Sequence, residues 1–333
     1  MSFTRAIQAA AAFLRRARND FDRRSLGYYA GAFCVLLCGL VLLMPSPYVI
    51  ETPGPTRNVL GTSSGKQIIA ISGARTHKQS GKLLMVTVNA SGVPGYPVPN
   101  IATLVMYFRP DTTVLPSEAV FTPGQTSEEY DKEANKEMSS SQKAATKQAL
   151  AYAKKLGVDV SGVNVDMHID DIGGPSAGMM YTLGVISKLT ARDETGGKTI
   201  AGTGTMESNG KVGAIGGIRL KMQGAKRDGA TWFLAPASNC DEVVGHVPSG
   251  LRDVKVSTLD EAYKALDEAY KALEEKPTDP DTDSSTDSGN TSDSGNKGNK
   301  KGCKGGIETS SVMLFMLGLV AVYAIVKKRR VNE

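Results

Sequence analysis

The chain has 333 residues, enough for one large domain or two ordinary ones, and it carries a formal net charge of +5. The basic excess lies in the two end segments, residues 1–25 and 327–333. Between them, 29 Lys and Arg are balanced by 31 Asp and Glu. This distribution excludes a nucleic-acid surface as the origin of the charge and indicates membrane topology. Three histidines and four cysteines show no metal-ligand spacing, so we expect isolated thiols and neither a metal nor a cofactor.

The first apolar segment, residues 26–44, contains no charged residue, and its length is at or just below that needed to span a bilayer. It is flanked by arginines before and prolines after, namely Arg15, Arg16, Arg18, Arg23, Arg24, Pro45 and Pro47. A cleaved signal peptide is the alternative, but the basic region is long and no small-x-small cleavage site is evident. We therefore expect a cytoplasmic basic N-terminus at 1–25 and an uncleaved transmembrane signal anchor at 26–44.

Residues 49–275 are expected to form one domain of mixed strands and helices. In chain order the pattern predicts strands at 68–71 and 83–88, a helix at 138–156, a strand at 163–169, a helix after 176, strands at 199–205 and 211–215, a helix at 218–228 and a strand at 232–234. Ser208-Asn209-Gly210 is a turn signal between two of these strands. Hairpins mixed with helices favour the α+β class.

The C-terminal part of the chain changes character three times. Residues 259–265 repeat directly as 266–272, and this period of seven predicts a closing helix of the domain. Residues 276–306 are rich in Asp, Ser, Thr, Asn and Gly, which predicts a disordered spacer. A second apolar segment at 307–326 precedes the basic tail 327–333, which predicts a C-terminal transmembrane helix. Both termini would then be cytoplasmic and the domain extracytoplasmic.

Two glycine-rich motifs, Gly173–Gly178 and Ile215–Lys221, carry the candidate chemistry. Gly173-Gly174-Pro175-Ser176-Ala177-Gly178 places a serine at the predicted start of a helix, where free N–H groups suit an oxyanion. A serine nucleophile needs a base, and Lys221 can be that base only if burial lowers its pKa. The apolar neighbours of Lys221 favour burial, although by itself a lysine on a helix is more often solvated.

Together the motifs resemble the proteolytic domain of Lon-type serine peptidases over roughly residues 72–265. Four stretches in the family's order carry the resemblance: Tyr48–Pro55, Asp171–Gly178, Gly197–Thr205 and Leu234–Cys240. The chain is most similar to membrane-anchored Lon-like proteases of Gram-positive bacteria. The resemblance implies a Ser–Lys dyad, with Ser176 as the nucleophile and Lys221 as the base.

The sequence departs from this family in several places. Its membrane-anchored members usually carry a PDZ module before the serine turn, where this chain has room for only about ten residues, and no ATPase module of the full Lon proteases is present. The Thr or Ser that often orients the base lysine corresponds to Glu207, with Thr205 two residues earlier. The acid near the serine is displaced to Asp171. We include neither acid in the catalytic set.

Gly174–Gly178 also fits the Gly-x-Ser-x-Gly elbow of an α/β-hydrolase esterase, which would need Asp241 and His246. A catalytically silent surface scaffold is a further alternative. We expect an ATP-independent, membrane-anchored serine endopeptidase that cleaves extracytoplasmic unfolded or membrane-proximal proteins with Ser176 and Lys221. The resemblance also implies ring-shaped homo-oligomers, which two membrane anchors would restrict.

Overall fold

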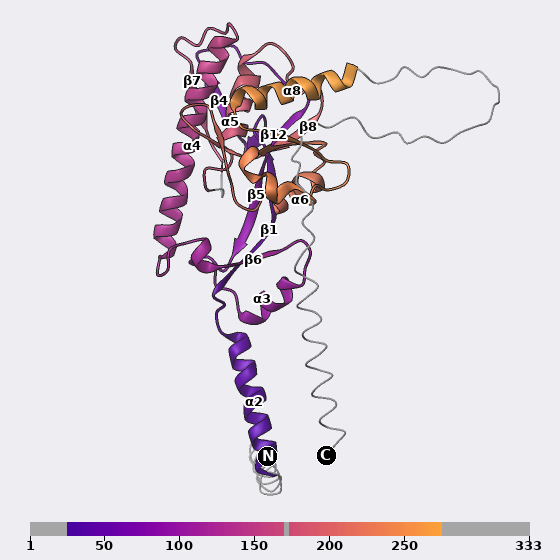
Figure 1. Cartoon of the computed structure of the whole chain (residues 1–333). Helices are drawn as coiled ribbons and strands as arrows, with labels where there is room; N and C mark the ends of the chain where they lie inside the picture. The colour runs from indigo at the N-terminus through magenta and orange to yellow at the C-terminus, as the bar shows by residue number, and fades with distance from the viewer. Residues whose placement is uncertain (1–24, 170–172, 275–333) are drawn as a thin grey trace, which may run out of the picture.

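The computed structural model describes residues 25–169 and 173–274 (Figure 1). Its elements in chain order are α2 (Leu26–Leu43), β1 (Tyr48–Asn58), β2 (Thr62–Ser63), β3 (Lys66–Gln67), β4 (Ile69–Ser72), β5 (Lys82–Ser91), α3 (Asn100–Tyr107), β6 (Thr113–Pro116), η1 (Ser117–Ala119), α4 (Ser127–Lys155), β7 (Asn164–Met167), α5 (Gly178–Leu189), β8 (Thr199–Gly202), β9 (Thr205–Met206), β10 (Val212–Gly213), α6 (Ile218–Arg227), β11 (Trp232–Pro236), η2 (Ala237–Asn239), α7 (Cys240–Val243), β12 (Arg252–Val256) and α8 (Leu259–Glu274).

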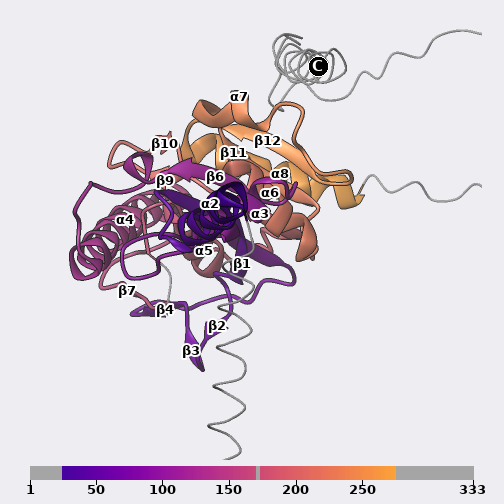
Figure 2. The same cartoon turned by 90° about the horizontal axis from the view of Figure 1, so that it is seen from below.

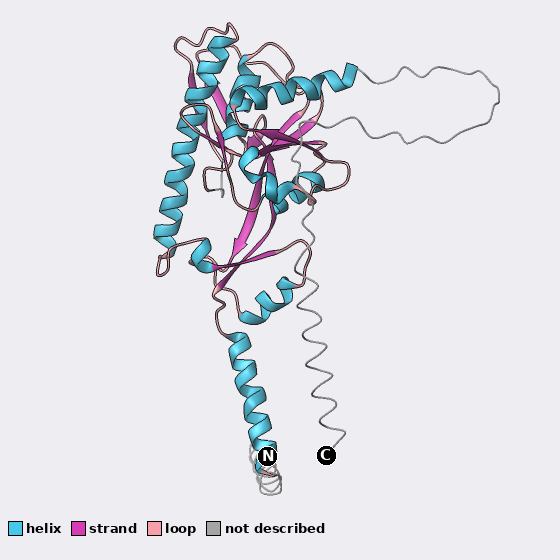
Figure 3. Cartoon of the chain, viewed as in Figure 1, coloured by secondary structure: helices cyan, strands magenta, loops and turns pink. Residues whose placement is uncertain are grey.

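The central sheet has six strands in the order β12-β11-β8-β5-β1-β6. The pairs β12-β11, β11-β8 and β8-β5 are parallel, whereas β5-β1 and β1-β6 are antiparallel. The fold is therefore mixed α/β (Figure 3). The predicted hairpin across Ser208-Asn209-Gly210 is confirmed as β9 and β10. The hairpins emphasised by the α+β prediction do not account for the parallel half, whose strands are joined by helical crossovers such as α6.

Alternating side chains of the strands build two apolar cores. On β5, Leu83 and Met85 belong to the core that contains α5, whereas Leu84 and Val86 belong to the core that contains Ile218 of α6. This alternation follows from the two-residue period of a strand. Helices α5 and α6 therefore cover opposite faces of the sheet (Figure 1). Their N-terminal ends bring the two glycine-rich motifs toward the same region.

Helix α5 is the central helix, since every one of its residues is buried. It packs between the sheet and α4, whose own buried residues include Ala145, Ala149 and Ala153. A side chain at Gly178, the first residue of α5, would lie 2.7 Å from the backbone nitrogen of Met206. Only glycine allows α5 to begin this close to β9, which fixes the position of the preceding serine turn.

Helix α2 extends away from the domain as a separate rod (Figure 1). It has 18 residues, a mean hydropathy of 2.2 and no buried residue, and within the described ranges it is the one helix apolar and long enough to cross a membrane. Its position agrees with the predicted anchor at 26–44. The predicted spacer at 276–306, second span at 307–326 and tail at 327–333 lie outside the described residues.

Several elements differ from the sequence predictions for identifiable reasons. Helix α4 begins at Ser127 rather than near 138, because its first turns are polar and carry no apolar period. A capping box between Thr126 and Glu129 starts it instead. The strand β1 was not predicted, because Pro53 and Pro55 argue against a strand. The structure accommodates both prolines at an irregularity in register between Pro53 and Thr56.

The expectation of isolated thiols is wrong for Cys240. Cys240, the first residue of α7, is disulfide-bonded, whereas Cys34 and Cys38 are free and exposed on α2. The spacing of cysteines in the sequence does not reveal which thiols meet in the fold, so it could not predict this bond.

Candidate active site

Ser176 lies in the turn directly before α5 and is half-buried. Its backbone carbonyl accepts hydrogen bonds from the Gly204 N–H at 2.8 Å and from the Thr203 hydroxyl at 3.1 Å. The Ser141 hydroxyl of α4 donates to the Pro175 carbonyl at 2.9 Å. These contacts hold the turn between α4 and the segment that follows β8. The N–H groups of Ser176 and Ala177 make no hydrogen bond within the described residues, so they are available to an oxyanion.

Lys221 lies in the first turns of α6 and is only 3% exposed. The helix begins after Gly217, which has a φ of +67° that suits glycine. Burial lowers the pKa of Lys221 to about 8, and the carboxylate of Glu51 acts in the opposite direction. A lysine with this pKa is partly neutral near neutral pH, as a general base requires.

Thr203 connects the two predicted catalytic residues. The Lys221 Nζ donates to the Thr203 Oγ1 at 3.5 Å, and the same hydroxyl donates its proton to the Ser176 carbonyl. Thr203 is fully buried immediately after β8. The sequence left open whether Thr205 or Glu207 supports Lys221. The hydrogen bond of the lysine amine goes to Thr203 and to neither of these residues, and Glu207 is exposed.

Glu51 is a second neighbour of Lys221 that the sequence analysis did not single out. It lies on β1 and is 9% exposed, and burial raises its pKa while Lys221 partly offsets that rise. The two side chains form no ion pair within the described residues, so Glu51 acts through the electric field. A lone acid within the apolar start of Tyr48–Pro55 was the available signal.

The dyad meets where β8 stops and β5 continues. Strand β8 ends at Gly202, whereas β5 extends to Ser91. The uncovered part of β5, the turn before α5 and the first turns of α6 enclose a cavity of about 160 Å³ lined by Ser176, Lys221 and Thr87, among others. The structure thus brings both predicted residues to one cavity. Their side chains share no direct hydrogen bond, and Thr203 is the connection between them.

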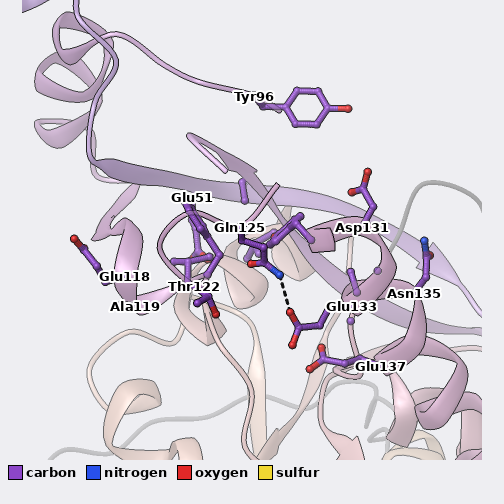
Figure 4. Close-up of a pocket in the computed structure, with 18 of the residues that line it drawn as sticks. Glu51, Tyr96, Glu118, Ala119, Thr122, Gln125, Asp131, Glu133, Asn135 and Glu137 are labelled. Carbon is purple, nitrogen blue, oxygen red and sulfur yellow. Dashed lines mark hydrogen bonds between the residues drawn. The ribbon is translucent and has the colours of Figure 1, made fainter. Parts of the chain in front are cut away.

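A larger cavity of about 1080 Å³ adjoins the first, and both are lined by Val88, Gly173 and Gly174. Figure 4 shows carboxylates around it, from Glu51, Glu118, Asp131, Glu133 and Glu137. The Gln125 amide donates to Glu133 at 2.8 Å. Within the described ranges no three His, Cys, Asp or Glu side chains are grouped to hold a metal ion. The cavity is large enough to hold several residues of an extended peptide.

The esterase alternative needs residues that lie elsewhere. Asp241 and His246 are exposed on and after α7, and the His246 Nδ1 lies 3.0 Å from the Val244 carbonyl. Neither residue lines the cavity that contains Ser176. Asp171 lies outside the described residues.

Replacing Glu51 by glutamine is expected to shift the pH–activity profile toward lower pH. The carboxylate raises the pKa of Lys221, so its removal leaves more neutral lysine at a given pH. The measurement is the pH dependence of peptide hydrolysis by the full chain. Glu118→Gln is the matched control, because Glu118 lines the larger cavity but does not perturb Lys221. An unshifted Glu51→Gln profile would contradict the assigned coupling.

A serine at a helix start, beside a buried lysine of lowered pKa, is the arrangement of a serine hydrolase that uses a lysine base. The Lon protease (S16) C-terminal proteolytic domain family matches residues 98–272, just over half of the chain. The chain therefore belongs to this family of serine endopeptidases.

Similar curated proteins agree with this membership. The chain is 33% identical over 177 residues to Lon protease 1 of Sorangium cellulosum, covering 50% of this chain and 22% of that protein. It is 31% identical over 185 residues to the Lon protease of Mycolicibacterium smegmatis, covering 50% of this chain and 24% of that protein. The chain thus spans less than a quarter of the length of these relatives.

Proposed function

We propose that this protein is an ATP-independent, membrane-anchored serine endopeptidase that cleaves unfolded or membrane-proximal proteins outside the cytoplasm. The observation that carries the proposal is the cavity shared by Ser176 and Lys221, in which burial lowers the pKa of the lysine to about 8. Membership of the Lon proteolytic domain family supports the same reaction.

In the proposed reaction the Ser176 hydroxyl attacks a peptide carbonyl while neutral Lys221 accepts its proton. The carbonyl oxygen becomes an oxyanion, and the free N–H groups of Ser176 and Ala177 are suited to stabilise it. The ammonium of Lys221 then protonates the departing amine, which leaves an acyl-enzyme on Ser176. Water activated by the same lysine hydrolyses that ester. Thr203 holds the lysine amine by its hydroxyl throughout.

Membrane anchoring and an extracytoplasmic site are supported by three features. Helix α2 is apolar and unburied. Basic residues flank the two apolar segments of the sequence on their outer sides, toward the two ends of the chain. The disulfide at Cys240 adds independent support, because disulfides persist mainly in oxidising compartments. We accordingly propose a basic tail at 1–25, an anchor at 26–44 and the protease domain at 49–275. A spacer at 276–306, a second anchor at 307–326 and a basic tail at 327–333 would follow.

Independence from ATP is supported by the short connection between α2 and the domain. Four residues separate Leu43 from β1, so no ATPase module lies between the anchor and the protease domain. Without such a module, substrates would have to reach the cavity already unfolded.

The test is hydrolysis of unfolded casein by the full chain in detergent, with and without ATP and magnesium. We expect cleavage at the same rate in both conditions, and slow cleavage of a stably folded protein. Activity that requires ATP would contradict ATP independence alone. If the full chain is folded and binds casein without cleaving it, this would instead support the scaffold alternative.

A further inference from the structure

Helix α3 has an apolar face, and this face is exposed instead of packing on the core. Ile101, Leu104, Val105 and Phe108 follow the spacing of one helical face. All four are exposed, and Phe108 is 77% exposed. The one buried residue of α3 is Thr103. In a soluble helix the apolar face would be the buried one, so this helix presents that face to another apolar partner.

One further aromatic residue extends this surface. Tyr107 is 69% exposed. We call the five side chains the α3 apolar face: Ile101, Leu104, Val105, Tyr107 and Phe108. Tyrosine pairs an apolar ring with a polar hydroxyl, which suits the boundary between lipid and water. The composition of this face therefore fits a membrane interface.

The position of α3 identifies the partner. The Asn100 side chain donates to the Val41 carbonyl at 2.9 Å, and the Asn100 N–H donates to the Met44 carbonyl at 3.0 Å. Pro45 and Pro99 form a bridge between the two segments. Helix α3 therefore begins where the apolar helix α2 ends, and both lie at the same end of the domain (Figure 2). If α2 crosses the bilayer, α3 lies at its surface.

We propose that the α3 apolar face inserts into the outer boundary of the lipid bilayer, so that the protease domain is held against the membrane at two places. This inference rests on the proposed anchoring by α2. An interfacial helix buries its apolar face roughly 5–10 Å into the headgroup and acyl boundary. The contact limits rotation of the domain about α2, which keeps the active-site cavity at a fixed orientation to the membrane.

The test introduces one tryptophan at a time into the full chain, reconstituted into phosphatidylcholine vesicles brominated near the headgroup end of the acyl chains. Phe108→Trp probes the α3 apolar face, and Phe33→Trp in α2 is the reference for anchoring. Leu156→Trp is the matched control, since Leu156 is 42% exposed at the end of α4 remote from α2 (Figure 1). The signal of wild type, whose single Trp232 is buried, is subtracted.

We expect bromine to quench Phe33→Trp and Phe108→Trp but not Leu156→Trp, with Phe108→Trp quenched at least as strongly as the reference, because an interfacial face lies at the depth of the bromine. Quenching of Phe33→Trp alone would overturn the inference and leave the anchoring intact. A blue-shifted but unquenched Phe108→Trp whose emission reverts on dilution would assign the face to a second copy of the chain. No quenching at either position would overturn the anchoring and the inference together.

Discussion

Replacement of Ser176 by alanine is expected to lower kcat/KM for peptide hydrolysis about 10⁴-fold or more. The substitution removes one oxygen atom, and the hydroxyl of Thr87, which also lines the 160 Å³ cavity, already donates to the Pro55 carbonyl. The turn itself should persist, because its hydrogen bonds to Gly204, Thr203 and Ser141 use backbone carbonyls. Folding should therefore be unchanged while the chemistry is lost.

The control for this variant is Ser238→Ala, which changes an exposed serine after β11 and should keep full activity. Both proteins are compared with wild type on one fluorogenic peptide, with circular dichroism to establish folding. Hydrolysis by Ser176→Ala at the wild-type rate would remove Ser176 from the mechanism.

Replacement of Lys221 by methionine is expected to abolish hydrolysis and, at the same time, to stabilise the fold. Methionine fills a similar volume without an amine, so the serine loses its base. In the folded protein the pKa of Lys221 is about 8, against 10.5 in its unperturbed state. The unfolded chain therefore binds the proton more tightly than the folded chain does, and the wild type loses stability as the pH falls from above 10.5 toward 8.

Below pH 8 the lysine is protonated in both the folded and the unfolded chain. The lowered pKa then reduces the free energy of unfolding of the wild type by its full amount, about 3 kcal/mol. At pH 7 the methionine variant should exceed the wild type by about this free energy of unfolding. The difference should shrink to about 1 kcal/mol at pH 10.

The measurement is urea unfolding of the full chain in mild detergent at both pH values. Lys226→Met, an exposed lysine on the same helix, is the matched control and should show little change at either pH. A Lys221→Met protein no more stable than wild type at pH 7 would indicate that the lysine amine is solvated.

This combination of lost activity and gained stability would also separate a functional lysine from a structural one. Replacing a lysine that stabilises the fold lowers the free energy of unfolding. Replacing a buried base that is kept for catalysis raises it. From its burial and lowered pKa we propose that Lys221 belongs to the second group. Its hydrogen-bond partner, Thr203, offers a neutral hydroxyl, and the Glu51 carboxylate raises the pKa of Lys221 by less than burial lowers it.

Local patterns in the sequence were sufficient for the elements that carry the site. The run of apolar residues after Ser176 predicted α5, because helical spacing is a property of near neighbours. The same reasoning located α6, β5 and β11 to within a few residues. It missed α3, because a short helix with an exposed apolar face has no polar face toward solvent for the pattern to detect. It also missed β12, in which three of the five residues are charged and only Val254 and Val256 are buried.

The sequence by itself determined that a serine stands at a helix start beside glycines, that Lys221 follows a second glycine turn, and that an apolar segment precedes the domain. These depend on residues adjacent in the chain. Only the tertiary structure decided that Lys221 is buried, that Thr203 holds it and that Glu51 raises its pKa, because these partners lie 18 and 170 positions away. Burial and electric field are set by packing across the sheet, and neither can be read from neighbours in sequence.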